Sequence, residues 1–237
     1  MLGSISLADT LDDFREFMVL NPHEIVTVFW EFGYNMRAFP TTEEQIMLRA
    51  QLHRAVQKAQ LLPHLYVQRN ASHDWPTLHT MISHGTRLVF FTDRVFGNLS
   101  AWDNDQWRHT SQTTFKASDI EELAKKCSLW DPSVKLAVVN HFTVLGALGV
   151  NAASTDFLAK FLRIKFFANV NRNPFFAKRV VSCAQDISRF PSFIAVDFWE
   201  SSDVLQVVNL LNCNFYSGNA SWDTANANRT AKILDLA

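Results

Sequence analysis

The sequence predicts an α/β fold in which parallel strands alternate with the helices that cover them. Segments with apolar residues at helical spacing alternate with short apolar runs along most of the chain. The short runs are almost continuously apolar and rich in β-branched and aromatic residues, as strands buried on both faces are. An open doubly wound sheet and a (β/α)₈ barrel both fit. No GxGxxG or GxxxxGK[ST] motif follows any strand, which weakens a nucleotide-binding open sheet, while five strands are too few to close an eight-stranded barrel.

Helices are predicted where this apolar spacing follows a capping residue. The first begins behind Ser6 or Thr10 and ends at Asn21-Pro22. A second helix is expected from Thr41 or Thr42 to Leu61, and a third over 75–85, with Pro76 in its first turn and Gly85 as its C-terminal cap. A fourth should run from the Ser118–Glu121 capping box to Cys127. The last two are expected over 154–187, with an interruption at Asn173-Pro174, and over 203–213.

Five strands are predicted between these helices, over 24–32, 65–68, 87–93, 135–142 and 192–199. Residues 94–117 are polar and irregular, and we expect a loop long enough to have a function. The residues after 213 have the composition of a polar tail.

The bulk composition is that of a globular protein. Of 237 residues, 48% are hydrophobic and 19% charged, and the formal net charge is −1. The absence of a basic excess argues against a nucleic-acid partner. No run approaches the ~20 apolar residues needed to span a bilayer, and the opening MLGSISLADTLDDF has no basic or apolar region of a signal peptide.

The cysteines and the glycosylation sequons bear on the compartment. Three cysteines (Cys127, Cys183 and Cys213) lie far apart without metal-ligand spacing, so one disulfide with one thiol and three free thiols both fit. Four N-x-[ST] sequons occur, at Asn70, Asn98, Asn219 and Asn228. The motif is loose, and it favours a secretory route only slightly.

Polar residues collect where four of the predicted strands end. In parallel α/β folds the site forms at the carboxyl ends of the strands. Glu31, Asp93, His141 and Asp197 hold such positions. Side chains alternate along SFIAVDFW, so Asp197 falls on the face opposite Ile194 and Val196, which we expect to pack under helices. The sequence therefore predicts a site to which these four residues contribute. No metal-ligand spacing occurs among the histidines.

Four blocks in this order resemble the phosphatidylinositol-specific phospholipase C-like phosphodiesterases that contain an X domain. The blocks are NPHEIVTVFWE, WPTLHTMISHGTRLVFFTD, KLAVVNHF and SFIAVDFW followed by SSDVLQVVNLLN. The resemblance implies that these are strands four, six, seven and eight of a TIM-type (β/α)₈ barrel, with LYVQ as strand five. Residues 1–213 would then form the C-terminal part of such a barrel, and 214–237 a tail.

The resemblance also implies a reaction. The family cleaves a phosphodiester by attack of the inositol 2-hydroxyl on phosphorus, with one histidine as general base and a second as general acid. An arginine or a calcium ion stabilises the developing charge. An inositol phospholipid or its head group would be the partner, met at a membrane surface by a secreted protein. No cofactor is predicted for this chain itself, and the sequence does not predict an oligomeric state.

Asp197 matches the family's final-strand aspartate, which holds the base histidine in its working tautomer. Glu31 matches an acidic position of strand four. Asp93 and His141 are expected to contact substrate, although bacterial relatives place a basic residue where this chain has Thr92-Asp93. No THNSY-like motif with the first histidine occurs, and Met1 falls where the helix after strand three would begin, so we expect a fragment or mis-started gene product that is inactive alone.

Two other functions fit the same residues. A barrel-derived chain without the histidines could serve as a non-catalytic binding protein, although an open sheet would expose two strand edges. A glycosidase-like barrel could use Glu31 and Asp197 as acid and nucleophile, which for a retaining mechanism requires carboxyl groups ~5–5.5 Å apart.

Overall fold

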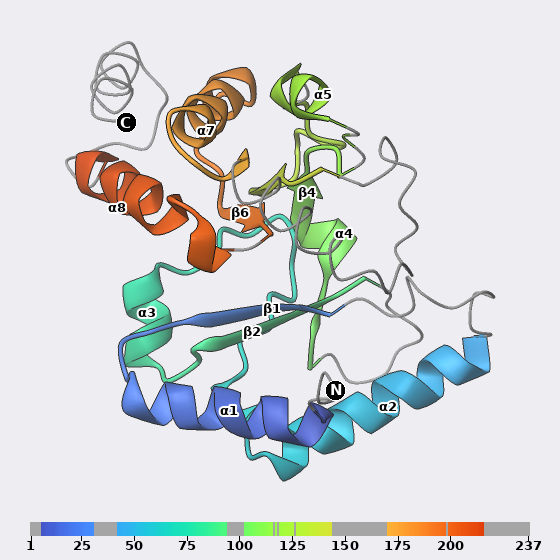
Figure 1. The fold of residues 1–237 in the computed structure, drawn as a ribbon. Coiled ribbons are helices and arrows are strands. Elements are labelled where there is room, and N and C mark those ends of the chain that lie inside the picture. Colours follow the sequence, from blue (N-terminus) through green and yellow to red (C-terminus); the bar gives the residue numbers. More distant parts are fainter. Residues whose placement is uncertain are drawn as a thin grey trace, which may run out of the picture. The chain divides into compact units, whose positions relative to one another are not determined.

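The computed structural model describes residues 6–30, 42–93, 102–143 and 170–215, apart from residues 116, 118, 126 and 198. The chain divides into two compact units, Met1–His109 and Thr110–Ala237. Each unit contains one sheet of three parallel strands with helices, as Figure 1 shows. The mixed α/β class predicted from the sequence is therefore confirmed.

The first unit contains the sheet β1-β2-β3. Its elements are α1 (Leu7–Leu20), β1 (Val26–Trp30), α2 (Thr42–Lys58), the 3₁₀ helix η1 (Leu62–His64), α3 (Leu78–Ser83), β2 (Leu88–Thr92), β3 (Asn104–Asp105) and α4 (Gln106–His109).

Helices α1 and α2 cover one face of this sheet (Figure 1). Leu11 and Met18 of α1 and Val56 of α2 are fully or almost fully buried against Leu88 and Phe90 of β2. The opposite face bears aromatic residues, and the rings of Phe29 and Phe91 stack with centroids 5.0 Å apart. β2 is buried along its whole length, which explains its almost continuously apolar sequence, whereas the residues of β1 are half-buried.

Both ends of α1 and the C-terminal end of α3 follow the predicted signals, whereas Thr77 is the N-terminal cap of α3, so Pro76 precedes that helix and does not lie in its first turn. Ser6 caps α1 through a capping box with Asp9, and Asn21 ends that helix. Gly85 follows α3 with a φ of +71°, a backbone conformation that glycine adopts without strain. The buried Arg87 completes the end of α1, because its guanidinium donates hydrogen bonds of 2.8–2.9 Å to the carbonyl oxygens of Met18, Asn21 and Glu24.

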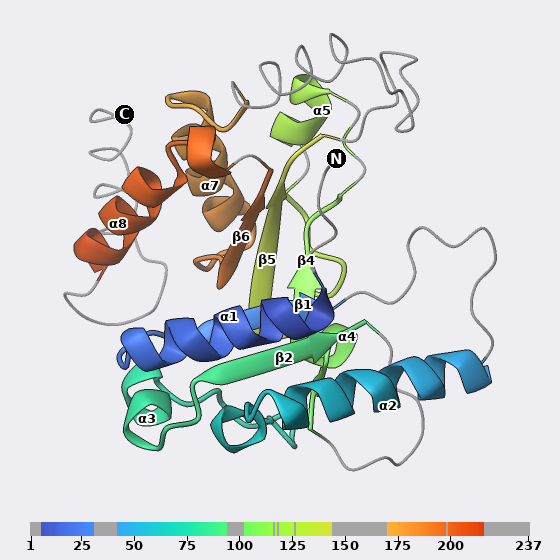
Figure 2. The same cartoon turned by 60° about the horizontal axis from the view of Figure 1, so that its bottom comes forward.

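The second unit contains the sheet β4-β5-β6, whose strands lie side by side in Figure 2. Its elements are β4 (Thr110–Gln112), α5 (Ile120–Lys125), β5 (Leu136–His141), α7 (Phe175–Asp186), β6 (Phe193–Val196), the 3₁₀ helix η2 (Trp199–Ser201) and α8 (Val204–Phe215).

Helices α7 and α8 pack on one face of β6. Ile194 and Val196 contact a core formed by buried residues of both helices, namely Phe176, Ala177, Val180, Val207 and Leu211. This is the alternation predicted from SFIAVDFW. Cys127 and Cys183 form a buried disulfide in the same unit. Of the two cysteine arrangements considered above, the structure therefore has the one that contains a disulfide.

The prediction for residues 65–68 is wrong, because this segment is not a strand. Only Leu65 makes a bridge, to Leu88, and β1 pairs directly with β2 in the register Val26↔Leu88. Val26 N donates to the Arg87 carbonyl and Tyr66 N to the Leu88 carbonyl. Consecutive carbonyls of a strand point to opposite sides, so the segment lies on the far side of β2 from β1.

The prediction of an irregular loop over 94–117 is also wrong in part. It contains β3, α4 and β4. These elements were missed because they are short and polar, and their burial depends on hydrogen bonds. The Asn104 side chain accepts a bond from Gln68 N and donates to the carbonyl oxygens of Tyr66 and Phe90. A side chain thus makes the connections that a strand backbone would otherwise make.

Candidate functional site

The face of the second sheet turned away from α7 and α8 carries polar residues at the carboxyl ends of its strands. Gln112 pairs in register with Val138, and Asn140 pairs with Ala195, so these residues share one face. The Asn140 amide donates to Gln112 Oε1 at 2.9 Å and to the Thr113 carbonyl at 2.8 Å. Both side chains are buried, so the network fixes their orientation.

Asp197 follows directly after β6 and continues this face by alternation from Phe193 and Ala195. Its backbone is held in place, because the side-chain amide of the buried Asn171 donates to the Asp197 carbonyl oxygen. The Asn171 carbonyl in turn accepts from Asp203 N at 3.0 Å. This brings the turn before α7 against the turn before α8.

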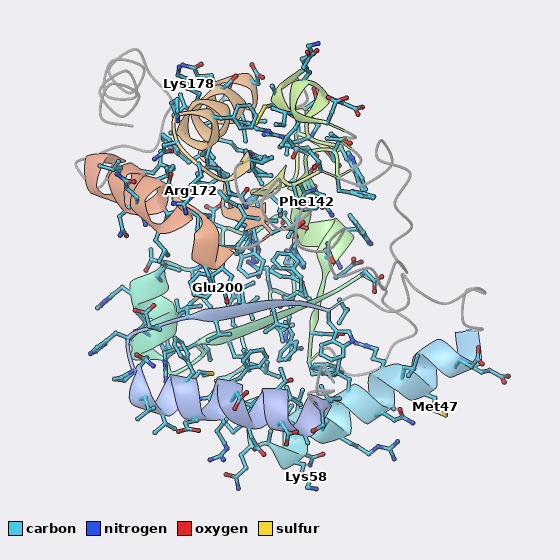
Figure 3. All side chains as sticks on the ribbon, in the orientation of Figure 1. Met47, Lys58, Phe142, Arg172, Lys178 and Glu200 are labelled. Atoms are coloured by element: carbon cyan, nitrogen blue, oxygen red, sulfur yellow. A yellow bond between two sulfur atoms is a disulfide. The ribbon has the colours of Figure 1, made fainter. Side chains whose placement is uncertain are left out.

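A salt bridge supports the same junction. Arg172, labelled in Figure 3, lies in the turn before α7 and contacts Asp203 Oδ1 at 3.0 Å. The second oxygen of Asp203 accepts from Asn173 N at 2.8 Å. Because both carboxylate oxygens of Asp203 bind residues of the segment before α7, this carboxylate stabilises the fold and is not available to a ligand. Asp197 differs from it in this respect.

The carboxyl group of Asp197 makes no hydrogen bond or ion pair with any residue that the structure describes. The residue is exposed to solvent, yet neighbouring atoms remove enough water from the carboxyl group to raise its pKa above the ordinary value. A partly desolvated carboxylate without a partner gains free energy from a nearby N–H donor or cation. The position can therefore receive a cationic or N–H-bearing group.

His141 lies on the opposite face, under the helices. It pairs in register with Val196, and its ring contacts Phe176 of α7 edge-on with centroids 4.7 Å apart. It is fully buried, and its Nε2 lies 3.0 Å from the Val170 carbonyl oxygen, which makes Nε2 the protonated nitrogen. Burial lowers its pKa to about 4. This geometry favours a neutral, structural imidazole over contact with substrate.

Asp93 lies at the carboxyl end of β2, in the first unit. Its backbone N–H donates to the Trp30 carbonyl oxygen at 3.2 Å, and its own carbonyl accepts from Trp107 Nε1 at 2.8 Å. The residue is half-buried. Glu31 lies outside the described residues.

A buried ion pair that the sequence did not reveal lies on the helix side of β2, just before Asp93. Arg49 of α2 donates through Nε and Nη2 to the two carboxylate oxygens of Asp103, and its guanidinium lies 5.9 Å from the centre of the Trp102 ring. Thr92 Oγ1 donates to the same carboxylate at 2.9 Å. The Arg49 and Asp103 side chains are 3% and 1% exposed, so the pair connects α2 to the segment before β3 and is closed to a ligand.

Among residues 6–30, 42–93, 102–143 and 170–215, no three His, Cys, Asp or Glu side chains gather in a way that could hold a metal ion. No helix among the residues described is long and apolar enough to cross a membrane.

A chain of parallel βα units with polar groups at the carboxyl ends of its strands belongs to the α/β class whose sites form at that edge. The family follows from comparison with known proteins. A protein-family model described as PI-PLC X 1 matches residues 2–212, and the chain therefore belongs to the PI-PLC X family. No curated protein and no solved structure matches the chain.

Alternation of side chains, applied to every strand, would have improved the predicted site. In KLAVVNHF it places Asn140 with Val138, opposite Val139 and His141. Val139 packs with the disulfide under α7. The rule that selected Asp197 therefore selects Asn140, where position at the strand end alone had selected His141.

Proposed function

We propose that this protein acts in the cleavage of the phosphodiester bond of inositol phospholipids, and that Asp197 positions the histidine that serves as general base. The observation that carries the proposal is the partly desolvated carboxyl group of Asp197 at the end of β6, which has no hydrogen-bond or ion-pair partner among the described residues, in a chain of the PI-PLC X family. Membership of the family supports the reaction, and the position of Asp197 supports its role.

The residue would act through the imidazole beside it. The base takes the proton of the inositol 2-hydroxyl as that oxygen attacks phosphorus, and an acid returns a proton to the leaving glycerol oxygen. A carboxylate that accepts a hydrogen bond from the other ring nitrogen fixes the tautomer and stabilises the imidazolium that forms. The imidazolium would offset the desolvation that now raises the pKa of Asp197.

The strand order supports a barrel of the TIM type as the frame of this site. All pairs are parallel, and the order in each sheet follows the sequence without a reversal. A doubly wound sheet would change direction at a switch point. In this proposal β1 and β2 are consecutive strands of the barrel, because β1 pairs directly with β2 and no strand lies between them.

The Asp197→Asn substitution tests the role of this residue. In the active full-length protein, assayed on phosphatidylinositol vesicles, we expect kcat to fall by roughly 10²–10⁴-fold with KM unchanged. Without the carboxylate the base histidine has a lower pKa, so the acidic limb of the kcat profile moves to lower pH. The matched control is Glu200→Gln, an exposed acidic residue three positions along, labelled in Figure 3, which should leave kcat unchanged.

Two results would overturn the proposal. The first is a kcat that Asp197→Asn leaves unchanged in an active enzyme. The second concerns residues 1–237 assayed alone, which contain no THNSY-like histidine motif and should release no inositol phosphate. Release that Asp197→Asn abolishes would mean that the base lies within this chain, and His141 could then be tested in the same way.

The remaining parts of the proposal follow from the substrate. The lipid lies in a bilayer, so the protein would work at a membrane surface. The buried disulfide supports a location on the secretory or extracellular side. The glycosidase alternative depends on the separation of Glu31 and Asp197, and Glu31 is outside the described residues. The family match favours phosphodiester chemistry over it.

A further inference from the structure

The turn between residues 68 and 74 presents an asparagine to solvent. Gln68 anchors the base of the turn, since its side-chain amide donates to the Asp74 carbonyl at 3.0 Å. Asn70 and Ser72 at the tip are exposed. His73 N donates to the Asn70 carbonyl at 3.1 Å, which closes the turn. The tip is therefore held in one conformation while its side chains stay accessible.

Asn70, Ala71 and Ser72 form the sequon Asn-Ala-Ser, and their side chains are already in contact. Asn70 Oδ1 accepts hydrogen bonds from Ser72 N at 3.0 Å and from Ser72 Oγ at 2.8 Å. Oδ1 is the side-chain atom of Asn70 that makes these hydrogen bonds within the turn. Asn70 Nδ2, the atom that would carry a glycan, makes no hydrogen bond with any residue in the described ranges. Loss of a proton from this nitrogen would leave the turn intact.

A second feature, in the other unit, indicates the compartment in which such a modification occurs. The disulfide between Cys127 and Cys183 is buried, at 2% and 0% exposure. Disulfides form and persist in oxidising compartments such as the lumen of the secretory pathway. N-linked glycans are added to N-x-[ST] sequons on surface loops of secreted proteins. The disulfide and the sequon thus point to the same compartment independently.

We infer that Asn70 is an N-glycosylation site. The donor is an oligosaccharide joined through a diphosphate to a polyprenyl lipid, supplied by the transferase of the secretory pathway. Asn70 Nδ2 forms a bond to the anomeric carbon of the sugar, the bond from that carbon to the diphosphate oxygen breaks, and the amide proton goes to the catalytic base of the transferase. The lipid diphosphate leaves, and no oxidation or reduction takes place. The inference does not depend on the proposed function.

The experiment uses the full chain, secreted from a eukaryotic host behind a cleavable leader. Trypsin cuts after Arg69 and Arg87, so Asn70 begins the peptide 70–87, which contains no other sequon. The purified protein is denatured and treated with a peptide N-glycosidase in heavy-oxygen water before it is digested with trypsin, because the glycosidase does not act on an asparagine at the N-terminus of a peptide. We expect this peptide to carry the mass of a labelled aspartate at position 70, and the untreated protein to show it as a glycopeptide.

Substitutions in the tip provide the controls. Ser72→Ala destroys the sequon and should abolish occupancy, whereas Ser72→Thr keeps it and should retain occupancy. Asn70→Gln should increase the electrophoretic mobility of the intact protein by the amount that corresponds to the loss of one glycan. Because the tip is exposed, all three variants should be secreted with the wild-type disulfide and circular dichroism spectrum. A secreted, disulfide-bonded wild-type protein whose peptide 70–87 is unmodified would overturn the inference.

Discussion

The buried imidazole of His141 makes the stability of the second unit depend on pH. Desolvation by burial lowers its pKa to about 4, the neighbouring charge of Arg179 acts in the same direction, and the hydrogen bond to the Val170 carbonyl opposes both. In the unfolded chain the pKa returns to an ordinary value near 6.5. The folded state therefore holds the neutral ring and resists its protonation.

The sign of the effect follows from linkage. Above the unfolded pKa the ring is neutral in both states and the group costs nothing. As pH falls from 6.5 through about 4, the unfolded chain binds the proton first, so the free energy of unfolding decreases. With ~1.4 kcal/mol for each unit between the two pKa values, the full loss is about 3 kcal/mol.

The His141→Gln variant isolates this contribution. Glutamine can donate to the Val170 carbonyl from nearly the same position as Nε2, and it does not titrate. Urea unfolding followed by circular dichroism at several pH values between 7 and 4 should show wild type losing about 3 kcal/mol more than the variant. His79→Gln, at an exposed position of α3, is the control and should keep the wild-type dependence. Equal losses for wild type and His141→Gln would refute the reasoning.

Two further predictions concern the buried connections of each unit. Replacing Arg49 by methionine leaves the carboxylate of Asp103 buried with Thr92 as its hydrogen-bond donor, and should cost about 3–5 kcal/mol of unfolding free energy in urea titrations. Adding Asp103→Leu should recover most of that loss, and failure to do so would mean that the cost is one of packing. Replacing Cys127 and Cys183 together by alanine opens a loop with a sequence separation of 56 residues and should cost about 4 kcal/mol in the same titration. A loss below ~1 kcal/mol would mean that the unfolded chain gains little freedom when the bond is absent.

The long strands and helices could be predicted because apolar spacing alone determined them. In β5 and β6 every other residue contacts the helices, and the capping residues of α1 marked where that helix begins. The strands β3 and β4 could not be found in this way. Their residues are polar and become buried through side-chain hydrogen bonds to segments distant in sequence, as Asn104 does with residues 66, 68 and 90.

The site was predicted in part for a related reason. Position at the end of a strand places a residue near the edge of the sheet, but the face depends on counting along the strand, which separates Asn140 from His141. Asn171 could not be selected from the sequence, because its partner Asp197 lies 26 residues away. Only tertiary contacts show that Asn171 holds the backbone of Asp197.

The three bonds from Arg87 to the end of α1 have a consequence for synthesis on the ribosome. The carbonyl groups at residues 18, 21 and 24 acquire their donor only when residue 87 has left the exit tunnel, together with the strand that pairs with β1. Until then the last turn of α1 is open to water. More than sixty residues must therefore be synthesised after α1 before these three carbonyl groups acquire their donor, so the end of this helix is completed only when the first unit folds.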